Sequence, residues 1–278
     1  MQPITTEIVS RTIIKRPADS HKGNYGRIML IGGNQNFGGA IIMAATAATY
    51  SGAGLVTVAT DPSNFTSLHA RLPEAMVIDY HQTDTLLNLL AGMDVIVIGP
   101  GLGTDTVADQ LLTAVLAATH VPQRLVIDGS ALTLLAQQAR PLPATDIVVT
   151  PHQMEWQRLS GIAIKDQTPT ANHDAQQRLG VTAVVKAHRT TVYTDERVWF
   201  NPGGTPAMAT GGMGDTLAGM IGSFVSQFHN FTDAVLSAVY LHSAIADDLA
   251  ATRYVVLPHQ ISTRIPTYMH RFSQIERP

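Results

Sequence analysis

Short apolar runs alternate with longer, helix-like stretches along most of the chain. The short runs end in glycine or a polar residue, which is typical of strands buried inside a parallel sheet. The predicted strands cover residues 27–32, 55–60, 94–98, 125–127, 147–149 and 183–185, and the predicted helices cover 40–51, 85–90, 105–118, 131–138, 172–179 and 233–251. This alternation predicts an α/β fold with a central, mostly parallel sheet flanked by helices.

Two segments depart from the alternation. Residues 1–20 form a polar lead-in, in which we expect a helix near residues 5–14. Residues 190–193 and 198–200 lie on either side of a charged turn and predict a short antiparallel pair. We find no linker, repeat or low-complexity segment and therefore expect one domain over residues 1–278.

The composition narrows the classes of function. The 278 residues carry a net charge of −3 and no basic block, so we do not expect nucleic acid as the main partner. The absence of cysteine excludes disulfides and a thiol nucleophile and is compatible with a reducing cytoplasm, where we expect the protein to act. Residues 38–60 lack charge, but Gly52 and Gly54 divide them into a helix and a strand, so we expect no membrane span.

Residues 201–219 form a glycine-rich stretch, Asn-Pro-Gly-Gly-Thr-Pro-Ala-Met-Ala-Thr-Gly-Gly-Met-Gly-Asp-Thr-Leu-Ala-Gly. With histidine neutral, Asp215 is the only charged side chain between Arg197 and Asp233. Glycines before a helix leave backbone N–H groups free to bind an anion, which the helix dipole also favours. Asp215 is therefore either a helix cap or a carboxylate that acts on a group beside that anion.

Glycine-rich or polar sequence repeatedly follows a predicted strand. The instances are residues 33–39, Gly99-Pro-Gly-Leu-Gly103, Asp128, Thr150-Pro-His152 and Lys186. Ligands of parallel α/β sheets bind at the carboxyl ends of the strands. The regularity therefore predicts one shared site, although no P-loop is present and residues 99–103 match a dinucleotide fingerprint only loosely.

Each polar residue of this predicted site also has a purely structural interpretation. Asp128 either orients a ligand or a metal-bound water, or it caps the next helix. Glu155 either holds Mg²⁺ through water or closes a capping box. Lys186 is one of only four lysines and either contacts phosphate or is a solvated hairpin charge. His242 and His259 form either a metal pair or part of a satisfied polar face.

The ordered set of motifs resembles that of the ADP/ATP-dependent NAD(P)H-hydrate dehydratases, a family of the ribokinase-like superfamily. The resemblance runs from about residue 20 to the end of the chain. Its motifs are Lys22-Gly-Asn-Tyr-Gly26, Gly38-Gly-Ala40, Gly99 to Gly103, Thr150-Pro-His152 with Glu155, Lys186 to Thr190, and Asn201 to Gly219. The resemblance implies a ribokinase-like three-layer α/β fold.

The resemblance also implies a reaction. The substrate is the 6-hydroxy hydrate of NADH or NADPH, a damaged and inactive cofactor. Phosphoryl transfer from ADP, or from ATP, converts the hydroxyl into a good leaving group, and elimination then restores the reduced nicotinamide with AMP (or ADP) and phosphate as products. Asp215 is implied to be the base that takes the hydroxyl proton.

Further residue roles follow from the same resemblance. It assigns substrate binding to Ala40, Gly103, His152 and Asp215, nucleotide binding to Lys186, Ala187, His188, Arg189, Thr190, Gly212 and Gly214, and Mg²⁺ binding to Glu155. It also suggests a homotetramer. Some relatives carry an epimerase domain, but only about twenty residues precede Lys22, so we expect the epimerase to be a separate protein.

Two positions depart from the family pattern. Met154 and Ala187 stand where the family commonly has glycine. A Cβ atom at either position is expected to affect the approach of the backbone to the nucleotide, without touching the Asp215 carboxylate.

Two other functions share these residues. A ribokinase-like kinase of a vitamin-precursor alcohol would also use Asp215 and the glycines, but Lys22 to Gly26 and Thr150-Pro-His152 favour the dehydratase. A non-catalytic nucleotide-binding protein would not need the base.

Overall fold

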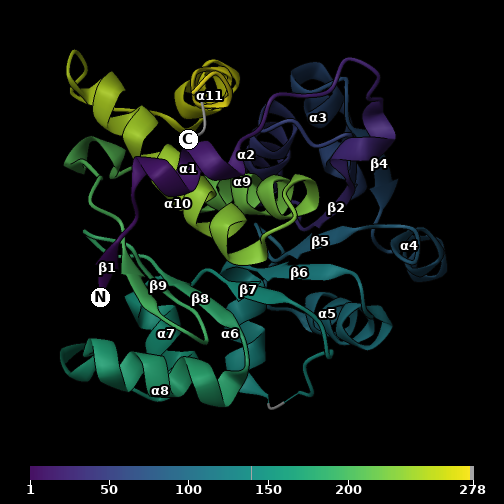
Figure 1. The fold of residues 1–278 in the computed structure, drawn as a ribbon. Helices are drawn as coiled ribbons and strands as arrows, with labels where there is room; N and C mark the ends of the chain where they lie inside the picture. Colours follow the sequence, from purple (N-terminus) through teal and green to yellow (C-terminus); the bar gives the residue numbers. More distant parts are fainter. Residues whose placement is uncertain (139, 276–278) are drawn as a thin grey trace.

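The computed structural model describes residues 1–138 and 140–275, which fold around one sheet (Figure 1). Within them the strands are β1 (Gln2–Pro3), β2 (Arg27–Ile31), β3 (Leu55–Thr60), β4 (Met76–Asp79), β5 (Val95–Ile98), β6 (Arg124–Ile127), β7 (Ile147–Val149), β8 (Thr182–Val185), β9 (Thr191–Tyr193) and β10 (Val198–Phe200). Their order across the sheet is β1-β10-β9-β8-β7-β6-β5-β2-β3-β4. The strands from β8 to β4 in this order run parallel, and β9 is antiparallel to both of its neighbours. The predicted mostly parallel sheet and the antiparallel pair are thus confirmed.

Helices cover both faces of this sheet. They are α1 (Thr6–Thr12), α2 (Gly38–Tyr50), α3 (Phe65–Arg71), α4 (Thr83–Leu90), α5 (Thr106–Ala118), α6 (Gly129–Gln137), α7 (Gln153–Ser160), α8 (Pro169–Leu179), α9 (Met213–Gln227), α10 (Phe231–Ala250) and α11 (Pro258–Ser273). Figure 1 shows α1, α2, α9, α10 and α11 above the sheet and α5 to α8 below it. No helix within the described residues is both long enough and apolar enough to span a membrane.

Each sheet face has its own hydrophobic core because side chains alternate along a strand. In β2, Ile28 and Leu30 belong to the core that includes α2, α9 and α10. Met29 and Ile31 belong to the opposite core, which includes α5 and α6. The strands are therefore apolar on both faces, which explains why they appear as continuous apolar runs in the sequence.

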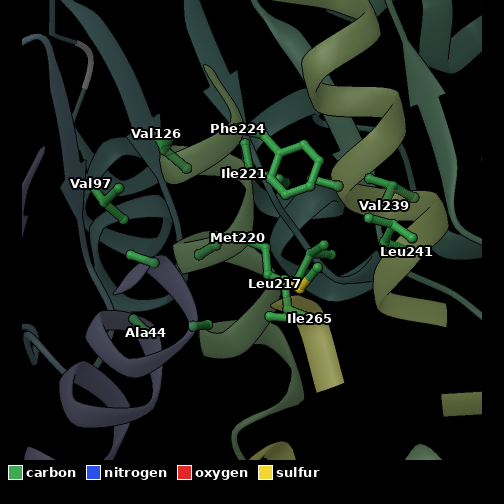
Figure 2. Close-up of a cluster of buried hydrophobic side chains, with 14 of the residues drawn as sticks. Ala44, Val97, Val126, Leu217, Met220, Ile221, Phe224, Val239, Leu241 and Ile265 are labelled. Atoms are coloured by element: carbon green, nitrogen blue, oxygen red, sulfur yellow. The ribbon is translucent and has the colours of Figure 1, made fainter. Parts of the chain in front are cut away.

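The close packing of α9 on α2 positions the helix that carries Asp215. A Cβ atom built on Gly219 would lie only 2.0 Å from the carbonyl oxygen of Ala44, so glycine allows the two helices to meet backbone to backbone. Figure 2 shows Ala44 of α2 near Leu217 and Met220 of α9, within the apolar cluster around Phe224. Four alanines of α2, Ala44, Ala45, Ala47 and Ala48, are also buried, and their small side chains allow close packing of this helix.

Five neighbouring parallel strands, β2, β5, β6, β7 and β8, end at the same edge of the sheet. The segments predicted to form the site follow these strands directly. Helix α2 follows β2 after a short loop, and its first turn therefore lies at this edge. The fold thus brings the predicted site segments together.

We predict that Gly219→Ala destabilises the protein by about 1–3 kcal/mol, because the new methyl group overpacks the contact between α2 and α9. The measurement is urea unfolding followed by circular dichroism. Gly39→Ala is the matched control, since a Cβ atom there meets nothing within 4 Å, and it should be neutral or stabilising by less than about 1 kcal/mol. Equal unfolding midpoints for the two variants would contradict this packing argument.

Candidate active site

Asp215 is the third residue of α9, whose N-cap is Gly212. The N-cap interpretation of Asp215 is therefore wrong, because the glycine occupies that position. Gly212 has a φ of 92°, a left-handed conformation that glycine adopts without strain. Asp215 thus stands beside the free N–H groups of the first helical turn, where the helix dipole favours negative charge.

The environment of Asp215 makes its carboxylate more basic than usual. Burial raises the pKa of Asp215 to about 6, the negative charge of Asp128 adds to the rise, and Lys186 opposes it. A carboxyl group with such a pKa is ionised at neutral pH, yet it accepts a proton far more readily than an exposed aspartate. These are the properties of a general base.

Asp128, which follows β6, binds Lys186, which follows β8, across the end of the intervening strand β7. The Nζ atom of Lys186 donates a hydrogen bond of 2.8 Å to Oδ1 of Asp128, and Oγ1 of Thr150 donates one of 2.6 Å to the same oxygen. Asp128 is the N-cap residue of α6, but its side chain makes no capping hydrogen bond, so the capping interpretation is wrong. Lys186 is not a solvated hairpin charge either, because only 21% of its side chain is exposed.

Lys186 remains charged in this setting. Burial alone would lower the pKa of the Lys186 ammonium, but the attraction of Asp128, Glu155 and Asp215 outweighs burial, and the net shift is upward. The ammonium lies over the start of α9, since a Cβ atom on Gly214 would be 3.0 Å from Nζ. Lys186 and the N–H groups of α9 therefore present positive charge to the same space.

Glu155 follows His152 at the start of α7 and closes a capping box. His152 accepts hydrogen bonds from the backbone of Met154 and Glu155 through Nδ1, and its own backbone N–H donates to Oε2 of Glu155 at 2.8 Å. The capping interpretation of Glu155 is thus confirmed. It does not exclude a metal, because a carboxylate can also accept other ligands through its second oxygen.

The donor set fits a magnesium ion that is held largely by a nucleotide. Among the residues that the structure describes, no group of three or more histidine, aspartate or glutamate side chains could enclose a metal. Mg²⁺ usually binds through one or two carboxylates, waters and substrate phosphates. Glu155, which is 8% exposed and held in place by the capping box, can supply such a carboxylate oxygen.

Ala40 and Gly103 lie on the other side of Asp128 along the edge of the sheet. Ala40 is in the first turn of α2, and its Cβ atom would be 3.0 Å from a Cβ built on Gly101. Gly103 adopts a φ of 86° next to the Asn34 side-chain amide. His152, whose side chain is 54% exposed, forms a parallel bridge with Lys186 and extends the same edge.

The loop after Lys186 packs on the glycine-rich stretch. Ala187, His188 and Arg189 are exposed, and Thr190 is partly buried. Arg189 donates a hydrogen bond to the carbonyl oxygen of Pro202, and the backbone N–H of Asn201 donates one of 2.8 Å to the carbonyl oxygen of Thr190. The loop is thus fastened to the segment that leads to Gly212 and Gly214.

The two C-terminal histidines differ in their exposure to solvent. His242 is 5% exposed inside α10, whereas His259 is exposed at the start of α11. Burial and the neighbouring Lys186 charge lower the pKa of His242 to about 4, so this side chain is neutral. The expectation of a satisfied polar face is wrong for His242, because its Nε2 atom has no hydrogen-bond partner among the described residues.

The hydrogen bond that Thr150 makes in the site was not predicted from the sequence. The strand-end pattern and the family motif include Thr150 without giving it a partner, and in the structure its hydroxyl donates to Asp128. The signal in the sequence was a threonine placed directly after a buried strand and before proline. A threonine in that position has no helical backbone to cap, so its hydroxyl is available to a neighbouring strand end.

A cavity of about 1000 Å³ lies near the last turn of α9, at the other end of that helix from Asp215. It is lined by Arg16 of the lead-in, by Tyr25, and by Gln227 at the last turn of α9, among other residues. Since Asp215 is in the first turn of the same helix, this cavity is not part of the candidate site.

Comparison with known proteins agrees with the fold and identifies the family. The family model described as NAD(P)H-hydrate dehydratase matches residues 28–267. A Lactiplantibacillus plantarum protein named ADP-dependent (S)-NAD(P)H-hydrate dehydratase is 99% identical over 278 residues, the full length of both chains.

Two crystal structures extend the agreement to three dimensions. A ribokinase-like superfamily protein from Enterococcus faecalis is 51% identical with a TM-score of 0.97, over 99% of this chain and 97% of that one. The ADP/ATP-dependent NAD(P)H-hydrate dehydratase from Bacillus subtilis, co-crystallised with ATP and Mg²⁺, is 30% identical with a TM-score of 0.86, over 98% of each chain. The predicted ribokinase-like α/β fold is therefore confirmed, and the chain belongs to the NAD(P)H-hydrate dehydratase family.

Proposed function

We propose that the protein is an ADP-dependent (S)-NAD(P)H-hydrate dehydratase, which restores NADH or NADPH from the 6-hydroxy hydrate. The observation that carries the proposal is the basic carboxylate of Asp215 at the start of α9, next to the Lys186 ammonium. A base and an anion-binding helix end in one place suit phosphoryl transfer to a hydroxyl group. The name of the 99% identical relative supports the same reaction.

In the first step Asp215 removes the proton from the 6-hydroxyl group of the substrate. The hydroxyl oxygen forms a bond to the terminal phosphorus of ADP, and the bond to the bridging oxygen breaks, releasing AMP. Lys186 and the backbone N–H groups from Gly212 to Gly214 stabilise the charge on the phosphoryl oxygens during transfer. The base and the positive charge are both in place before substrate binds, which lowers the cost of reorganisation.

In the second step the phosphate ester leaves. The lone pair of the ring nitrogen expels phosphate, and loss of a ring proton restores the reduced nicotinamide. Hydroxide itself is a poor leaving group, so the phosphoryl group is what makes the elimination possible.

Glu155 would hold the Mg²⁺ ion, which would neutralise charge on the nucleotide phosphates when bound. We assign the adenine nucleotide to Lys186, to residues 187–190 and to the glycines at the start of α9. Met154 and Ala187, which depart from the family pattern, are both exposed, so neither Cβ atom disturbs the packing beneath the nucleotide.

The hydrated dinucleotide is assigned to Ala40 and Gly103, which follow β2 and β5, to His152, which bridges to Lys186, and to Asp215. The small side chains at positions 40 and 103 allow a large ligand to approach the backbone. We further propose that the protein acts in the cytoplasm as a homotetramer and that a separate epimerase protein supplies the S epimer.

The direct test is recovery of reduced nicotinamide absorbance from NADH hydrate, with Mg²⁺ and either ADP or ATP. We expect recovery with ADP, release of AMP and phosphate in equal amounts, and no recovery without nucleotide. A thiazole or pyrimidine alcohol should not be phosphorylated at a comparable rate. Failure with both donors, or efficient phosphorylation of such an alcohol, would replace the dehydratase with a kinase.

Asp215→Asn should lower kcat by about 100- to 10,000-fold, since it removes the base, while Mg·ADP binding persists. The same variant should be more stable than the wild type at neutral pH by about 1–3 kcal/mol. Because the pKa of Asp215 is raised from 3.8 to about 6, the folded state binds the extra proton between these values, and wild-type stability falls as pH rises through that window. An active Asn variant would remove Asp215 from the role of base.

The pH profile of kcat/KM should have an acid limb with a pKa of about 6. Below that pH the Asp215 carboxylate is protonated and cannot accept the hydroxyl proton, so the rate should fall about tenfold per pH unit. Steady-state kinetics between mildly acidic and neutral pH measures the limb. A profile that stays flat down to the pKa of an ordinary aspartate would contradict the raised pKa.

A further inference from the structure

Asp128 is a buried carboxylate that the proposed reaction does not use directly. Only 3% of its side chain is exposed, and its Oδ1 atom accepts both the Thr150 hydroxyl and the Lys186 ammonium. The three residues follow β6, β7 and β8, which are adjacent in the sheet. The Asp128 side chain therefore crosses the end of β7 to bind a lysine that follows the second strand along. Thr150, which follows β7, lies between them and donates a hydrogen bond to Asp128.

Stability alone does not explain this arrangement. A buried ion pair usually contributes little net stability, because removing both charges from water costs about as much as their attraction returns. Asp128 also makes no side-chain capping bond to α6. The negative charge of a carboxylate this close to the start of α9 also opposes phosphate binding. Its presence there therefore needs a functional explanation.

Lysine has a flexible side chain, and its ammonium has three donors. One donor is directed at Asp128, which leaves two for phosphate oxygens. The hydrogen bond also fixes where Nζ lies, within contact distance of the Gly214 position at the start of α9. The backbone N–H groups and the ammonium thus converge before any nucleotide arrives.

We propose that Asp128, oriented by the Thr150 hydroxyl, is a positioning residue that holds the Lys186 ammonium over the start of α9 for the transferred phosphoryl group. This inference rests on the proposed function for the identity of the reaction. The expected effect of Asp128 on Mg·ADP binding does not depend on which reaction follows. A positioning role differs from a purely structural role in one respect: a substitution of Asp128 should affect binding and catalysis only when Lys186 is present.

A double-mutant cycle tests this dependence. Asp128→Asn should lower kcat/KM and weaken Mg·ADP binding by roughly 10- to 100-fold, as expected for the loss of a charged hydrogen bond. In a Lys186→Met background the same substitution should change either quantity by less than about threefold, because there is no ammonium left to position. Kinetics and titration calorimetry with Mg·ADP provide the two readouts.

Thr150 provides a milder variant in case the charge changes prevent folding. Thr150→Val keeps the shape but removes the donor, and it should lower kcat/KM by about fivefold. Thr150→Ser, which keeps the hydroxyl, should recover most of that loss. Asp233→Asn is the matched control: Asp233 is also buried and pairs with Arg11 at 2.7 Å, on α10 and α1, so its loss should alter thermal stability without altering Mg·ADP affinity.

Three outcomes separate the possibilities. An equal loss from Asp128→Asn with and without Lys186 would overturn the positioning role. A drop in melting temperature with unchanged Mg·ADP affinity would overturn it in favour of a structural pair. If the wild type binds Mg·ADP but does not dehydrate NADH hydrate, the proposed function fails, whereas the binding cycle still decides the role of Asp128.

Discussion

The backbone contact between α9 and α2 is the constraint on which the site depends. Gly219 lies against the Ala44 carbonyl oxygen, and this close approach fixes the direction of α9 over the sheet. The first turn of α9 then meets the edge where β6, β7 and β8 end, so that Gly214 comes under the Lys186 ammonium. A larger residue at position 219 would move the helix and, with it, the base and the N–H groups that the reaction needs together.

The position of α9 also determines which charged groups lie together at the carboxyl ends of the strands. Three carboxylates, those of Asp128, Glu155 and Asp215, surround one buried ammonium. Burial, and then repulsion by the other two carboxylates, raises the pKa of Asp215, while Lys186 stays charged. One arrangement therefore supplies both a base strong enough to take a hydroxyl proton and a cation for the phosphoryl group. His242, kept neutral by burial, adds no second positive charge beside Lys186.

Much of this could be predicted from the sequence, because buried parallel strands appear as apolar runs and glycine follows them where the backbone must turn. The edge strand β4, Met76–Asp79, was not predicted: its apolar run, Met76 to Ile78, is short, and no residue of the strand is fully buried. Helix α3 was not predicted, and no bounds were predicted for α11, which contains Pro266. Side-chain partners were the hardest to predict. Asp128 resembles a cap in sequence, and only the neighbouring strands show that it binds Lys186 and Thr150 instead.

The central claim is that the substrate hydroxyl itself becomes phosphorylated through Asp215. NADH hydrate carrying a heavy-oxygen label in its 6-hydroxyl group tests it directly, by mass spectrometry of the phosphate released with ADP as donor. The label should appear in phosphate, because the carbon–oxygen bond breaks after the oxygen has joined phosphorus. Label released as water, with unlabelled phosphate, would contradict it.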